Sequence, residues 1–156
     1  MTAWANVQQE TGLRRAKADA LGWPFAGTLI AGAIVATIIG LQTGERPPLS
    51  LLMFASLVLW QPAIEELLFR GLLQGILLTT GFGTRQLVGV SLANLLTSIA
   101  FVSTHFVYHS YFWAIAVFFP SLLFGFFRDR SGSVWPPLLL HIVFNLAFFA
   151  TAIRPV

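Results

Sequence analysis

Residues 61–74 read QPAIEELLFRGLLQ and lie inside an apolar run from residue 49 to residue 78. The stretch places Glu65, Glu66 and Arg70 among apolar neighbours. A charge near the middle of a bilayer costs about 2.5–3.5 kcal/mol on insertion scales, so an ionisable residue in a membrane span usually has a function. Three such residues within six positions therefore mark the part of the chain on which its fold and chemistry depend.

The composition indicates an all-α integral membrane protein. Of 156 residues, 56% are hydrophobic and 10% are charged, against about 25% charged in soluble domains. The chain has no cysteine, which excludes disulfides and thiolate metal ligands. Its net charge of +3 comes from basic residues in short connections. That distribution points to the lipid bilayer as a partner rather than nucleic acid.

The apolar segments predict a polytopic bundle of about five to six transmembrane helices, some broken by proline. Residues 1–24 are expected to be a cytoplasmic lead-in, and residues 25–153 a single intramembrane domain. The expected spans are residues 25–41, 49–80, 87–107, 112–127 and 136–153, with a polar turn at 128–135.

Several small features refine these spans. Gly32, Ala36 and Gly40 recur every four residues, which predicts close packing against another helix. Pro62 lies near the middle of residues 49–80, a run too long for one straight crossing. We expect a break near residues 61–63, followed by a new helix whose N-terminal dipole favours the two glutamates as anions. Pro120 is expected to interrupt a later span.

Charge asymmetry predicts a cytoplasmic N-terminus, and the small size of the chain favours the inner membrane of a prokaryote. With five crossings, six Lys and Arg fall on the N-terminal side, and Arg46 and Arg154 fall on the other. A sixth crossing at Pro62 would change this count.

Helical spacing assigns the intramembrane polar residues to pairs. Glu66 and Arg70 lie four apart and can form a structural pair, which leaves Glu65, about 100° around the helix, able to face a cavity. His105 is four residues after Phe101, and His141 is four residues before Asn145. Two carboxylates, a guanidinium and two imidazoles suit acid–base hydrolysis or metal binding. An asparagine amide can donate to an oxyanion.

Three motifs resemble one family. EELLFR fits EExxxR, FVSTH fits FxxxH and HIVFN fits HxxxN. The chain between about residues 62 and 146 is therefore similar to the CPBP intramembrane proteases, which include CAAX prenyl endopeptidases and bacteriocin-processing enzymes. Relatives have more spans, so a pared-down or homo-oligomeric enzyme is expected.

The resemblance implies specific roles. Glu65 and His105 would activate water, His141 and Asn145 would stabilise the oxyanion, and Glu66 and Arg70 would support them. It implies a glutamate-type enzyme with no metal cofactor, although one glutamate and two histidines could hold zinc. The substrate would be a membrane-associated protein or peptide.

Two alternatives stay open at this stage. The same ionisable residues could serve ion coupling in a non-catalytic transporter or scaffold. On simple spans, moreover, His105 and His141 fall near opposite membrane faces, so half-helices around Pro62 and Pro120 would be needed to unite them with Glu65.

Overall fold

The chain folds as an all-α membrane bundle. The computed structural model describes residues 7–8, 10–43, 49–107 and 110–151. Three described helical stretches are long and apolar enough to cross a membrane: Trp23–Gln42, Leu51–Leu78 and Tyr111–Ser131. Two shorter apolar helices, Leu92–His105 and Trp135–Ala150, complete the bundle. A short 3₁₀ turn, η1 (Ala18–Leu21), precedes the helix Trp23–Gln42.

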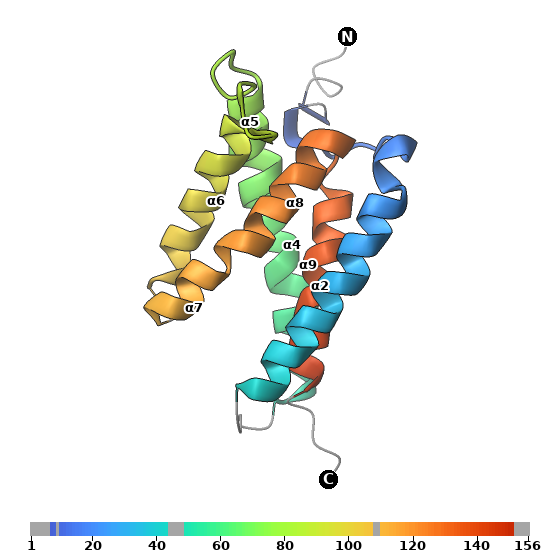
Figure 1. The fold of residues 1–156 in the computed structure, drawn as a ribbon, viewed down its shortest axis with the longest axis vertical. Coiled ribbons are helices and arrows are strands. Elements are labelled where there is room, and N and C mark those ends of the chain that lie inside the picture. Colours follow the sequence, from blue (N-terminus) through green and yellow to red (C-terminus); the bar gives the residue numbers. More distant parts are fainter. Residues whose placement is uncertain (1–6, 9, 44–48, 108–109, 152–156) are drawn as a thin grey trace.

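The described helices run up and down the long axis of the molecule in Figure 1. They are α2 (Trp23–Gln42), the long helix (Leu51–Leu78), α6 (Leu92–His105), the pair α7 (Tyr111–Ala116) and α8 (Phe118–Ser131), and α9 (Trp135–Ala150). A two-stranded hairpin, β1 (Gln86–Leu87) with β2 (Val90–Ser91), occupies the start of the span predicted at 87–107. That span is therefore shorter than expected.

The long helix contains two π-helical stretches. Its segments are α3 (Leu51–Ala55), η2 (Ser56–Trp60), α4 (Gln61–Glu65), η3 (Glu66–Leu73) and α5 (Gln74–Leu78), where η2 and η3 are the π-helical ones. At each junction the backbone keeps right-handed helical angles. Such stretches are rare and are often found at functional sites.

The predicted break at residues 61–63 is wrong, because the π-helical register accommodates Pro62. The Gln61 amide donates to the Ser56 carbonyl, five residues back. The next carbonyl in that register, Leu57, would face the nitrogen of Pro62, which has no hydrogen. The helix thus continues through the proline with one carbonyl in need of a donor. No helix begins before the glutamates, so the expected dipole effect is also absent.

α2 packs along α9 through its small residues, as predicted. A Cβ at Gly32 would collide with the ring of Phe144, and one at Gly40 would lie 2.8 Å from the Phe148 carbonyl oxygen. These close approaches bring α2 against the helix that carries His141.

The turn predicted at residues 128–135 begins later than expected. α8 continues to Ser131 and ends at Gly132, whose φ is +66°. Arg128 is therefore a buried helical residue and not part of a turn. The interruption near Pro120 lies at Val117, because proline is accepted within the first turn of α8. α9 begins at Trp135, one residue before the span predicted at 136–153, with Pro136 and Pro137 in its first turn.

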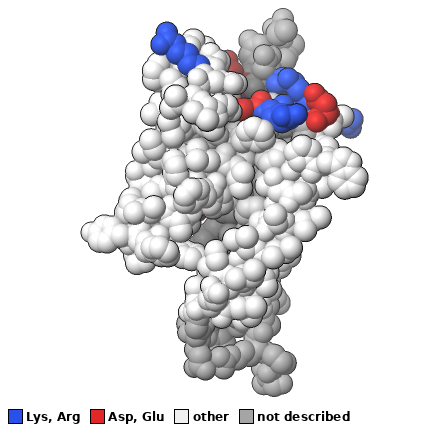
Figure 2. Space-filling view, in the orientation of Figure 1, with Lys and Arg blue, Asp and Glu red and all other residues white. Residues whose placement is uncertain are grey.

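Among the described residues, Lys, Arg and acidic side chains gather at one end of the molecule in Figure 2, and the other described residues visible there are uncharged, with a hollow near the middle of the face. This grouping fits an integral membrane protein. Arg46, Arg154 and residue 153, the expected end of the domain, lie outside the described residues.

Candidate active site

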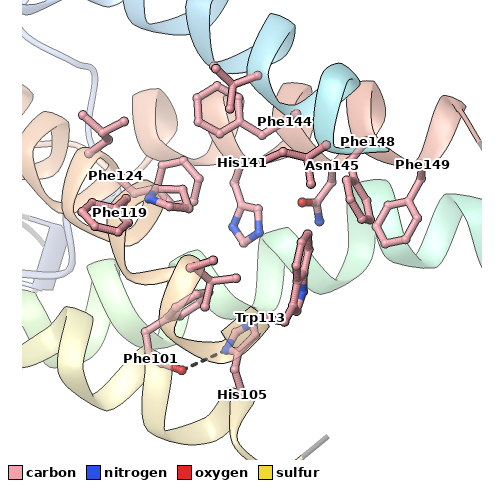
Figure 3. A pocket seen from close by; sticks show the side chains of 18 of the residues that line it. Phe101, His105, Trp113, Phe119, Phe124, His141, Phe144, Asn145, Phe148 and Phe149 are labelled. Atoms are coloured by element: carbon pink, nitrogen blue, oxygen red, sulfur yellow. Dashed lines mark hydrogen bonds between the residues drawn. The ribbon is translucent and has the colours of Figure 1, made fainter. Parts of the chain in front are cut away.

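A cavity of about 1030 Å³ lies between α2, α9, the long helix and the α6–α7 region. Glu65, His105, His141 and Asn145 all line it. Much of the remaining wall is apolar, with residues such as Val35, Trp113 and Phe144, or is formed by small side chains. Figure 3 shows His141 and Asn145 reaching in from one side, and Phe101 and His105 from the other.

The four predicted residues line the same cavity because α6 is short. It has 14 residues, which span about 21 Å, less than the hydrocarbon core of a bilayer. His105, its last residue, therefore lies partway along the bundle, and the C-terminal end of α6 stops short of the ends of α2 and α9 (Figure 1). No break at Pro62 is required for the four residues to line one cavity.

Glu66 is the most enclosed carboxylate of the site. Its Oε1 accepts from Nη1 of Arg70 at 3.1 Å and lies 2.8 Å from Nδ1 of His141. Both Glu66 and Arg70 are fully buried. The expected Glu66–Arg70 pair is thus present, and it extends to a histidine on another helix.

Glu65 faces the cavity next to His141. Its side chain retains 30% of its exposure, and Oε2 lies 3.6 Å from His141 Nε2. That separation is longer than a direct hydrogen bond and is of the size a bridging water can span. With Nδ1 turned to Glu66, Nε2 is the His141 atom that faces Glu65.

Arg70 is held by several groups at once. Nη2 donates to the backbone oxygen of Ser121 at 3.1 Å and to its hydroxyl at 2.7 Å. The guanidinium also lies 4.7 Å from the centre of the Phe101 ring and 5.3 Å from that of Phe124. A charge-assisted pair with such neighbours is rigid.

Two aromatic rings orient the histidines. Phe124 stacks on His141 with ring centres 4.8 Å apart. Phe101 lies 4.5 Å from the His105 ring and 6.2 Å from the His141 ring. His105 Nδ1 lies 2.9 Å from the Phe101 carbonyl. A carbonyl only accepts, so this contact makes Nδ1 the donor and Nε2 the acceptor in a neutral ring.

The Asn145 side chain donates a hydrogen bond to the backbone carbonyl that Pro62, which has no N–H, leaves without a donor. Its Nδ2 donates to the Leu57 oxygen at 2.9 Å. One of the two amide hydrogens is thus used by the long helix. The other is still able to donate, and it belongs to a side chain that lines the cavity.

Sequence reasoning missed a second polar cluster next to the site. Gln74 donates to the Gly125 carbonyl at 2.9 Å and to Asp129 Oδ1 at 2.8 Å, and Arg128 Nε donates to the Arg70 carbonyl at 3.0 Å. The position of Gln74, eight residues after Glu66, could have indicated this cluster, because both then lie on one helix face. Asn94 of α6 donates to the Leu122 carbonyl of α8 at 3.0 Å, a hydrogen bond between the two helices.

The family model of the type II CAAX prenyl endopeptidase Rce1-like proteins matches residues 47–147. The chain belongs to this family. The match contains all six residues of the predicted site, whereas the wall that α2 gives to the cavity lies outside it. No curated protein and no solved structure matches the chain.

Membership of the Rce1-like family makes this protein a CAAX-type intramembrane protease at the level of the family. Its substrate is accordingly a protein or peptide, and its apolar helices make it an integral membrane protein. Within the described part of the chain, no three His, Asp or Glu side chains are grouped as metal ligands would be.

Proposed function

We propose that this cavity hydrolyses a peptide bond of a membrane-associated protein or peptide, with Glu65 as the base that activates water. The observation that carries the proposal is the shared cavity wall of Glu65, His105, His141 and Asn145. Of the two glutamates, only Glu65 lines the cavity, because Glu66 is enclosed by Arg70 and His141.

The reaction follows from these positions. Glu65, assisted by His105, takes a proton from water, and the oxygen forms a bond to the peptide carbonyl carbon. The negative charge that develops on the carbonyl oxygen is stabilised by the second amide hydrogen of Asn145 and, with both ring nitrogens protonated, by Nε2 of His141. When the C–N bond breaks, the nitrogen of the departing amine receives the proton that Glu65 removed.

Glu66 and Arg70 act as positioning residues in this scheme. Glu66 fixes His141 through Nδ1, and Arg70 fixes Glu66. A group oriented by a third side chain in this way keeps the geometry that the reaction needs.

We further propose that no metal takes part. The fixed positive charge of Arg70 beside Glu66 disfavours a second cation. The N-terminus is proposed to be cytoplasmic, in a prokaryotic inner membrane.

The test is cleavage of a candidate membrane-anchored peptide by purified protein in lipid nanodiscs. His105→Ala and His141→Ala should each lose most activity, and a chelator should leave the wild-type rate unchanged. Ser103→Ala, a matched change on the lipid-exposed side of α6, should be neutral. Loss of activity with the chelator would refute the metal-free mechanism, and full activity of both histidine variants would refute the assigned site.

A further inference from the structure

Four buried side-chain polar atoms have no hydrogen-bond partner among the described residues. They are Glu66 Oε2, Arg70 Nε, Gln74 Oε1 and Thr97 Oγ1, and all four side chains belong to residues that are fully buried. Burying a polar atom without a partner is strongly unfavourable, so each of these atoms in a native structure calls for an explanation, of which an ordered water is one. A ligand that can satisfy these atoms is therefore expected.

Three of these atoms lie along one face of the long helix. Glu66, Arg70 and Gln74 follow one another at intervals of four residues, which places their side chains in a row. The row faces α8, because Arg70 bonds Ser121 and Gln74 bonds Gly125 on that helix.

Thr97 closes this row from α6. One turn after Thr97 on α6, Phe101 packs against the Arg70 guanidinium. One turn before Thr97, Asn94 lies against Gly125, whose carbonyl accepts a hydrogen bond from Gln74. Thr97 shares the face of both, three residues from one and four from the other, so it lies at the level between Arg70 and Gln74.

The chemistry of the four atoms specifies their ligand. Arg70 Nε can only donate, and the glutamate and glutamine oxygens can only accept, whereas the threonine hydroxyl can do both. A small molecule that both donates and accepts hydrogen bonds can therefore pair with all four atoms. Water is the usual occupant of buried polar sites with two to four such partners.

The row also joins the active site to the charged end of the molecule. Glu66 contacts His141 at the cavity. Gln74 contacts Asp129, which is half-buried near the end of α8 and next to Arg130. The apolar wall of the cavity, by contrast, offers water few partners.

We propose that Glu66, Arg70, Gln74 and Thr97 hold a buried string of water that supplies the hydrolytic reaction from the charged end of the bundle. Each peptide bond cleaved consumes one water, so a membrane-embedded site needs continuous resupply. The supply role rests on the proposed function, whereas the water site itself does not.

Thr97→Val tests the site, because it replaces the hydroxyl with a methyl group of similar size. If the hydroxyl had no partner, its removal would raise Tm. If it shares water with Arg70 and Gln74, its removal should lower Tm by about 2–4 °C. Thr104→Val controls for the substitution on the same helix, since that hydroxyl donates to the Phe101 carbonyl.

The supply role is tested by kinetics on the same variant. Thr97→Val should lower kcat about tenfold with KM unchanged, a pattern that indicates a lost step and not lost binding, and Thr97→Ser should restore kcat. A raised Tm for Thr97→Val would overturn the water site. A lowered Tm with unchanged kcat would overturn the supply role. Because Tm needs no substrate, neither result depends on whether Glu65 is the base.

Discussion

Replacing Arg70 with methionine should destabilise the protein severely. Arg70 is fully buried, and its removal leaves the Glu66 carboxylate facing only His141. Breaking a buried ion pair by removing one partner costs about 3–5 kcal/mol. Two hydrogen bonds to Ser121 are lost as well, but part of that loss is already included because buried networks are not additive.

The assay is thermal unfolding in lipid nanodiscs, with Arg130→Met as the matched control on the exposed surface of α8. A loss of this size corresponds to a fall in Tm of about 6–20 °C for a chain of this length, whereas the control should change by less than about 2 °C. Activity at a temperature where Arg70→Met is still folded should also fall, because Glu66, which positions His141, is no longer held by Arg70. An Arg70→Met protein as stable as Arg130→Met would refute the view that this pair organises the bundle.

Three further changes test local features. Val88 has a φ of 52° at an exposed hairpin tip, so Val88→Asn should stabilise by about 1 kcal/mol in thermal unfolding; a lower Tm would contradict the strain. Gly32→Ala should destabilise by about 1–3 kcal/mol because its Cβ meets an aromatic ring, whereas Gly27→Ala on the same helix has open space and should be harmless; equal effects would refute the packing of α2 on α9. Asn145→Ala should cost about 1–3 kcal/mol by leaving a helix carbonyl unpaired, and less when combined with Pro62→Ala, which restores a backbone donor; an equal cost in both backgrounds would exclude that explanation.

The sequence predicted the bundle and the members of the candidate site because their signals are local. The cost of charge in an apolar run identified Glu65, Glu66 and Arg70, and the four-residue spacing predicted the Glu66–Arg70 pair that forms. The stripe of Gly32 and Gly40 predicted the packing of α2.

Other features depend on contacts between distant residues, and the sequence alone could not show them. The continuity of the helix at Pro62 depends on a π-helical register and on a donor from Asn145, 83 positions later in the sequence. The bond between His141 and Glu66 depends on how α9 rotates against the long helix. The length of α6, which decides where His105 lies, was hidden because the hairpin residues before it are also apolar.

The rate of peptide cleavage by Glu65→Gln, relative to wild type in a single turnover with saturating enzyme, tests the central claim most directly. This change keeps the size of the side chain and removes its basicity, so binding should be retained while cleavage falls by at least about 100-fold, the usual contribution of a general base. A Glu65→Gln protein that binds substrate and cleaves it at the wild-type rate would contradict the assignment of Glu65 as the residue that activates water.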